Sequence, residues 1–130
     1  MTDIARLLSS SHNIAIVGLS DRPERDSYRV ASYLKSQGYR IFPVNPNIQS
    51  VLGEPAYARL EDIPDPIDIV DIFRVSREVP AIVESAIQIG AKAVWMQIGV
   101  ISDQGLRRAL DAGLEVVMDR CMMVEHRRLS

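Results

Sequence analysis

Short apolar runs alternate with amphipathic segments along the whole chain. Five of these runs are rich in β-branched residues and short enough to be single strands. They span residues 13–17, 40–44, 68–73, 93–98 and 115–118. The first and third are almost continuously apolar, which is typical of strands that are buried on both faces of a sheet. The pattern therefore predicts five buried strands.

Helical spacing of apolar residues fills the segments between these strands. It is clearest over residues 79–86 and 106–110. A further helix is predicted over residues 28–37, with the hydroxyl of Ser27 as its cap. Left-handed glycines commonly end helices, and the chain offers one after each predicted helix, at Gly38, Gly90 and Gly113.

Strands that alternate with helices indicate right-handed crossovers and a parallel sheet. We predict an α/β fold with one domain over residues 1–130, built as a doubly wound five-stranded parallel sheet with helices on both faces. The proline-rich stretch 43–66 is a long connection, with a short helix or irregular turn near residues 59–63. Open sheets of this kind bind ligands beyond the carboxyl ends of their strands.

Composition narrows the class of protein. The chain has 130 residues, of which 47% are hydrophobic and 25% charged, enough for one packed core. A net charge of −2 and a pI near 5.6 argue against a general nucleic-acid binder. No apolar run approaches the roughly 20 residues of a membrane span, and no export signal precedes the first strand. The single cysteine, Cys121, favours a reducing, cytoplasmic setting.

Residues 18–27 form a long loop between the first strand and its helix. Phosphate binds well at such a helix N-terminus, and Arg22 and Arg25 can add charge-assisted hydrogen bonds. Ser20 offers a hydroxyl as well. The alternative is a solvated loop whose arginines pair only with its own carboxylates, those of Asp21, Glu24 and Asp26.

A nicotinamide dinucleotide site is not supported by this loop. The G-x-G-x-x-G fingerprint requires glycines at positions 20 and 23, where this chain has Ser20 and Pro23. The second strand ends at Asn45 without the acidic residue that binds the ribose of NAD. NADP stays open as an alternative, because an arginine can bind its additional phosphate.

Several short motifs occur in a characteristic order. They are residues 16–20 with Pro23, Arg25 and Ser27, then residues 38–39, 43–46, 71–74 and 119–121. Together they resemble the small CoA-binding proteins, a family similar to the N-terminal CoA-binding domain of the succinyl-CoA synthetase α subunit. The resemblance implies a Rossmann-like fold that binds coenzyme A, with the phosphates in the first loop, held by Gly18, Ser20 and Arg25.

The resemblance also implies contacts with the ligand in the loops after the second, third and fourth strands. The loop after the fifth strand lies at the same edge of the sheet and adds Arg120 and Cys121. The candidate site comprises Gly18, Ser20, Arg22, Arg25, Ser27, Asn45, Pro46, Phe73, Arg74, Ile98, Gly99, Arg120 and Cys121. Arg74 either contacts the ligand or forms an ion pair with Glu78, and Phe73 either completes the core or packs on the ligand.

Three further residues raise chemical alternatives. Cys121 either forms a mixed disulfide with CoA under oxidising conditions or is a small packed residue. His126 is interpreted as a surface or capping residue of a short terminal helix. Asp71 lies within the third strand and needs a partner if it is buried, although no metal-ligand spacing surrounds it.

Three functions follow from these observations. The first is non-catalytic binding of CoA or an acyl-CoA, since the chain has no recognisable catalytic motif and no room for the other parts of a ligase. The second is an NADP-linked oxidoreductase. The third is an interaction subunit with a vestigial nucleotide site, and either a second copy of the chain or an unidentified protein is a candidate partner.

Overall fold

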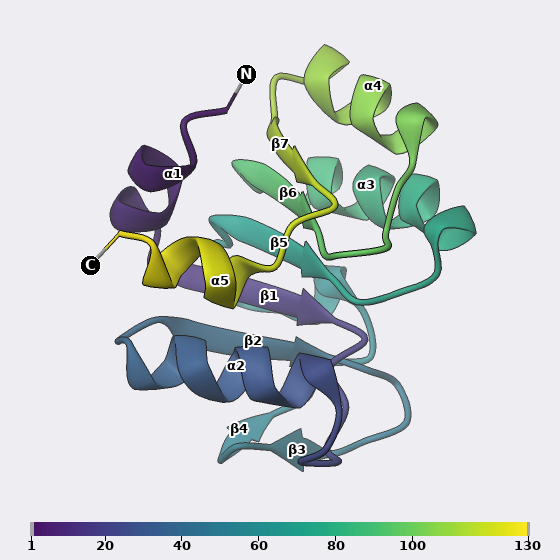
Figure 1. Cartoon of the computed structure of the whole chain (residues 1–130). Helices are drawn as coiled ribbons and strands as arrows, with labels where there is room; N and C mark the ends of the chain where they lie inside the picture. The colour runs from purple at the N-terminus through teal and green to yellow at the C-terminus, as the bar shows by residue number, and fades with distance from the viewer. Residues whose placement is uncertain (1, 130) are drawn as a thin grey trace.

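A computed structural model describes residues 2–129. Its centre is a five-stranded sheet in which all neighbouring strands are parallel, in the order β2-β1-β5-β6-β7 (Figure 1). The strands are β1 (Asn13–Val17), β2 (Arg40–Val44), β5 (Ile69–Ile72), β6 (Ala93–Met96) and β7 (Glu115–Met118). The predicted α/β fold with a five-stranded parallel sheet is confirmed, and its architecture is Rossmann-like.

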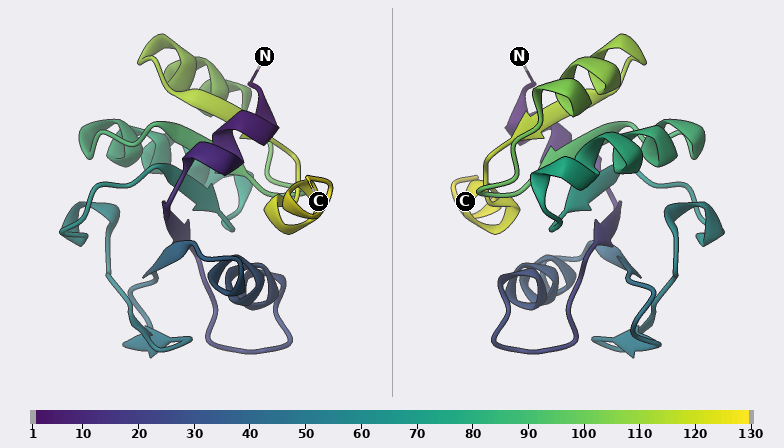
Figure 2. Two further views of the ribbon diagram at one scale, coloured as in Figure 1. Left: turned by 90° about the vertical axis from the view of Figure 1, so that its left-hand side faces the viewer. Right: turned by 90° about the vertical axis from the view of Figure 1, so that its right-hand side faces the viewer.

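Helices cover both faces of the sheet, as Figure 2 shows with the sheet between them. One face carries α1 (Ile4–Ser10), α2 (Asp26–Ser36) and α5 (Met122–Arg127). The other carries α3 (Val79–Gln88) and α4 (Asp103–Asp111). The chain moves outward from β1 to β2 and then returns to the other side of β1 at β5, so the strand order reverses between β1 and β5. Ligands of such sheets bind at this reversal point.

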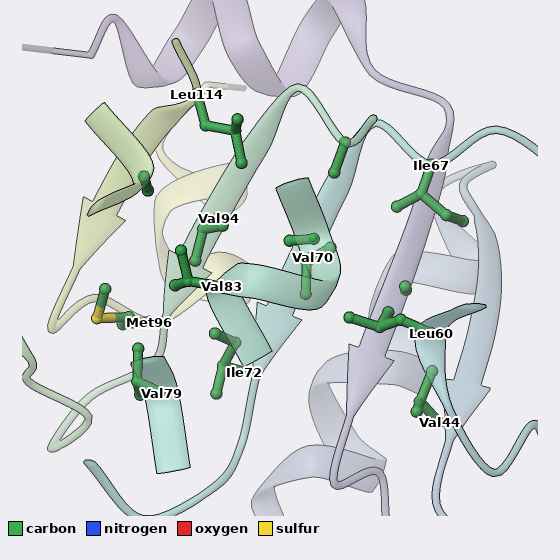
Figure 3. Close-up of a cluster of buried hydrophobic side chains, with 14 of the residues drawn as sticks. Val44, Leu60, Ile67, Val70, Ile72, Val79, Val83, Val94, Met96 and Leu114 are labelled. Carbon is green, nitrogen blue, oxygen red and sulfur yellow. The ribbon is translucent and has the colours of Figure 1, made fainter. Parts of the chain in front are cut away.

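Two apolar clusters hold the helices against the sheet. Ile14 and Ile16 face α1, α2 and α5, whereas Ala15 between them faces α3 and α4. Successive side chains of a strand point to opposite faces, so both helical layers are needed to bury a strand of this composition. Figure 3 shows the cluster on the side of α3 and α4, in which Val79 and Val83 of α3 pack over Val70 and Ile72 of β5.

The connection between β2 and β5 contains structure that the sequence did not predict. Two-residue strands β3 (Ser50–Val51) and β4 (Glu54–Pro55) form a small antiparallel hairpin. Its turn has positive φ at Leu52 and at Gly53. The short helix expected near residues 59–63 is the 3₁₀ turn η1 (Leu60–Asp62), and a second such turn, η2 (Ser76–Glu78), precedes α3.

Some predicted boundaries are wrong. The third and fourth strands end one and two residues earlier than expected, which leaves Phe73, Gln97 and Ile98 in loops. The helix after the first loop begins at Asp26, and Ser27 lies inside it rather than at its cap. The left-handed helix ends at the three predicted glycines are confirmed, with φ between 76° and 95°. None of the described helices is long and apolar enough to cross a membrane.

Candidate functional site

The loop after β1 lies directly against the loop after β5. Gly18 has φ +85°, and a Cβ atom at this position would lie 2.5 Å from the backbone oxygen of Phe73 and 2.8 Å from Cδ of Arg74. A side chain therefore cannot fit without moving one of the two loops. Glycine at this position brings the loops after β1 and β5 together at the point where the strand order reverses.

Two serine hydroxyls fix the shape of the first loop. The hydroxyl of Ser27, which is buried in α2, accepts a hydrogen bond of 3.0 Å from the backbone N–H of Ser20. The hydroxyl of Ser20 in turn accepts one of 3.1 Å from the N–H of Arg22. These bonds hold the loop against the first turn of α2, so both serines shape the site through the backbone.

This loop borders a hollow that we call the arginine pocket, with a volume of about 560 Å³. It is lined by Gly18, Ser20, Arg22, Glu24, Arg25, Asp26, Ser27, Phe73 and Arg74. The structure thus brings seven of the predicted site residues together around one cavity. Two carboxylates, those of Glu24 and Asp26, also lie in its wall.

The arginines of the pocket differ in their partners. Arg74 forms an ion pair with Glu78, with Nη2 2.9 Å from a carboxylate oxygen. This ion pair is one of the two alternatives proposed for Arg74. By contrast, neither the guanidinium of Arg22 nor that of Arg25 has a hydrogen bond or ion pair within residues 2–129. Both side chains are exposed, so an anion in the pocket can pair with them without breaking an existing contact.

A second hollow adjoins the first, and we call it the apolar pocket. Its volume is about 510 Å³, and it shares Asp26, Phe73 and Arg74 with the arginine pocket. Most of its remaining wall is apolar, formed by Val30, Val75, Ile98, Val100, Met123 and Val124. Phe73 is half-buried, packs against the core and lines both pockets, so the two alternatives proposed for it are compatible.

Three polar residues interrupt this apolar wall, namely Arg29, Gln97 and Cys121. Gln97 is only 4% exposed, and its Oε1 accepts a 3.0 Å hydrogen bond from the backbone N–H of Met122. Because that partner can only donate, the oxygen must face it and the amide NH₂ is left over. The NH₂ group has no partner in the described part of the chain. Sequence reasoning missed Gln97, although it directly precedes the predicted Ile98.

Four predicted residues line neither pocket. The amide of Asn45 joins two loops, since its Nδ2 donates to the backbone oxygen of Leu19 at 3.0 Å. Pro46 follows it and is exposed. Gly99 donates its N–H to Asp119 at 2.8 Å, and the backbone oxygen of Arg120 accepts from the indole of Trp95 at 2.8 Å. All four lie in loops at the carboxyl end of the sheet, but outside the two cavities.

Two buried groups lie beside the site rather than in it. Asp71 is fully buried in β5, and its carboxyl oxygens have no hydrogen-bond partner among residues 2–129. Burial raises the pKa of Asp71 well above its usual value. His126 is half-buried, with Nδ1 2.6 Å from the hydroxyl of Tyr33, so its interpretation as a surface or capping residue is wrong. The described residues contain no cluster of potential metal ligands.

Comparison with known proteins decides the family. The family model described as a CoA binding domain matches residues 12–127. The chain belongs to this family. YneT of Bacillus subtilis, itself an uncharacterized protein, is 40% identical to this CoA-binding domain protein over 124 residues, which is 95% of this chain and 92% of YneT.

Solved structures agree with this assignment. A hypothetical protein from Pyrococcus horikoshii OT3 superposes with a TM-score of 0.96 at 44% identity, covering 99% of this chain and 92% of that one. The expected relation to CoA ligases is confirmed by the ADP-forming acetate–CoA ligase II of Archaeoglobus fulgidus, 28% identical over 99 residues. This match covers 75% of the chain but only 15% of the ligase.

Proposed function

We propose that this protein binds coenzyme A, or an acyl-CoA, without catalysing a reaction of its own. The observation that carries this proposal is that the arginine pocket and the apolar pocket lie side by side and share Phe73 and Arg74 in their walls. CoA has the same division, with a phosphorylated nucleotide at one end and an uncharged pantetheine arm at the other. Membership of the CoA-binding domain family supports the same ligand.

In this proposal the arginine pocket binds the diphosphate and the 3′-phosphate of CoA. The pocket lies beside the N-terminus of α2, an eleven-residue helix whose first turn begins at Asp26. Arg22 and Arg25 have no other partner among the described residues and can pair with phosphate oxygens. The Arg74–Glu78 ion pair is exposed and therefore weak, so a phosphate can compete with Glu78 for that arginine.

The pantetheine arm suits the apolar pocket. The arm carries two amide groups on a short aliphatic chain, so it needs apolar walls and a few hydrogen bonds. The unpartnered NH₂ group of Gln97 is a donor for one of its carbonyl oxygens. NADP has no comparable uncharged arm, and Ser20 and Pro23 stand where a dinucleotide loop has glycines.

The absence of catalysis and the cytoplasmic location are parts of the proposal. The matched part of the Archaeoglobus fulgidus ligase is 15% of that protein, so the ligase has a much longer chain around the shared part. We infer that the present chain carries or presents CoA for a separate protein or a second copy of itself. Its single cysteine fits a reducing compartment.

Calorimetric titration tests the proposal directly. The purified chain is titrated with CoA, dephospho-CoA and NADP in one low-salt buffer. We expect CoA to bind at micromolar or lower Kd, dephospho-CoA to bind more weakly, and NADP to give no heat. If CoA gives no heat at several temperatures, the proposal fails and the interaction-subunit alternative takes its place.

A matched pair of variants locates the site. Arg25→Ala removes an unpaired guanidinium of the arginine pocket, and we expect it to weaken CoA binding about ten-fold. Arg107→Ala removes an exposed arginine of α4 that lines neither pocket, and equal effects of the two variants would contradict the site. Raising the salt concentration must weaken wild-type binding more than that of Arg25→Ala.

A further inference from the structure

Cys121 shares the wall of the apolar pocket with Gln97. We propose that Cys121 is a redox site at which the protein forms a reversible mixed disulfide with the thiol of CoA. This inference rests on the proposed binding of CoA. It assigns to the wall of the apolar pocket a covalent chemistry that CoA binding alone does not require.

The side chain of Cys121 packs against the core beneath α1, α2 and α5, but its thiol makes no hydrogen bond within residues 2–129. Cys121 is the N-cap residue of α5, but its side chain makes no capping hydrogen bond. The helix is held in place by other groups, namely the fully buried Met122, the hydrogen bond from its N–H to Gln97, and the contact between His126 and Tyr33. Cys121 itself is only partly buried and faces a cavity, so its sulfur is accessible to a ligand in that cavity.

Gln97 is an independent indication that a polar ligand enters this part of the pocket. Its side chain is almost completely buried, and its NH₂ group is left unpaired at the cavity wall by the hydrogen bond of Oε1 to Met122. An unpaired amide donor at a cavity wall can bond to a carbonyl or other acceptor of a ligand in that cavity. Cys121 directly precedes Met122, whose N–H binds Oε1 of Gln97, so this hydrogen bond ties the side chain of Gln97 to the residue next to the thiol.

The order of the two pockets determines which part of CoA reaches Cys121. Phosphates held by Arg22 and Arg25 place the nucleotide on one side of Phe73, and the arm then passes Phe73 into the apolar pocket. The thiol is the terminal group of this arm. Cys121 lines the apolar pocket but not the arginine pocket, so it lies on the side of Phe73 that the arm enters.

The reaction needs a disulfide as its oxidant, and CoA disulfide supplies it. The thiolate of Cys121 attacks one sulfur of CoA disulfide, forms the new S–S bond, and expels the second CoA as a thiolate that takes up a proton. No net oxidation occurs, since one disulfide replaces another. Excess low-molecular-weight thiol reverses the exchange and returns Cys121 to its reduced form.

Intact-mass spectrometry of the reduced full chain tests this proposal. The protein is incubated without other thiols with CoA disulfide or, in parallel, with glutathione disulfide at the same concentration. Cys121 is the only cysteine, so the mass of the adduct identifies the site. We expect one CoA adduct, reversed by dithiothreitol and formed at least about ten-fold faster than the glutathione adduct, because the bound nucleotide positions the disulfide.

Variants show whether the arginine pocket guides the reaction. Arg25→Ala is expected to remove most of the rate advantage of CoA disulfide and to leave the glutathione rate unchanged, whereas Arg107→Ala is expected to retain the advantage. If titration shows CoA binding but no adduct forms, or the two disulfides react equally fast, the redox site is refuted and CoA binding stands. If CoA does not bind at all and the two rates are equal, both proposals are refuted.

Discussion

Replacing Asp71 by asparagine should change how the stability of this protein depends on pH. Asp71 lies in the central strand β5, between Ile16 of β1 and Trp95 of β6 in the register of the sheet. It is fully buried, and neither carboxyl oxygen has a hydrogen-bond partner within residues 2–129. Burial raises its pKa well above the ordinary value, and the adjacent N–H of Ile72, which lacks hydrogen-bond geometry, only partly offsets this. The carboxyl group is therefore protonated over a wider pH range in the native state than in the unfolded chain.

The sign and size of the effect follow from this difference. The unfolded chain releases the proton near pH ~3.9, whereas the native chain keeps it to a higher pH. Between these two pKa values the native state binds more protons, so the free energy of unfolding falls as the pH rises. One group contributes a slope of about 1.4 kcal/mol per pH unit in this window. Asparagine cannot ionise, so Asp71→Asn removes this slope.

Urea denaturation of both proteins between pH 5 and pH 8, at constant ionic strength, measures the effect. The difference in free energy of unfolding, Asp71→Asn minus wild type, should rise with pH and level off above the native pKa of Asp71. The effects of other titrating groups cancel in this difference. Asp21→Asn, at an exposed loop position, serves as the control and should run parallel to wild type. Parallel curves for Asp71→Asn as well would mean that this carboxyl has the same pKa in both states, and would refute the reasoning.

Three other predictions concern the loops and helix ends. Gly18→Ala should lower the free energy of unfolding by at least about 2 kcal/mol, because of the close backbone contact and the positive φ. Gly38→Ala has the same sign of φ but open space around it, so a loss of about 1 kcal/mol is expected, and equal losses would contradict the steric argument. Partial burial raises the pKa of Asp68, but two backbone N–H donors and a lysine outweigh it and lower the pKa. Asp68→Ala should therefore cost about 1–2 kcal/mol at pH 7, measured by urea denaturation, and the loss should shrink as the pH falls through the lowered native pKa. Tyr33→Phe should cost about 1 kcal/mol through loss of the hydrogen bond to His126, and an unchanged urea midpoint would show that this bond adds no net stability.

Much of the fold could be predicted because the sheet is buried on both faces. Strands such as β1 must be apolar at consecutive positions, and this pattern is visible in the sequence without knowledge of the partners. The ends of three helices could also be predicted, since a left-handed conformation favours glycine at Gly38, Gly90 and Gly113. The hairpin of β3 and β4 could not, because its strands have only two residues each and carry no periodic signal.

The site was predicted as a set of loops rather than as two cavities. The position of each loop follows from the parallel sheet, so the sequence placed the arginines after β1 and Phe73 after β5 at one edge. Which side chains line a cavity depends on contacts between residues far apart in the chain. Asn45 ties one loop to another, and Arg120 binds Trp95 through its backbone, so both lie outside the pockets.

The sequence by itself determined the layered α/β architecture, the edge of the sheet at which the candidate site lies, and the charge available in the first loop. Only the tertiary structure decided which side chains and backbone groups hydrogen-bond to one another. Ser27 supports Ser20 across seven positions, and Gln97 holds α5 across 25 positions while leaving its NH₂ group free. Hydrogen bonds of this kind depend on the packing of whole elements and leave no local pattern, which is why the periodicity of the chain predicted the strands and helices but not the walls of the pockets.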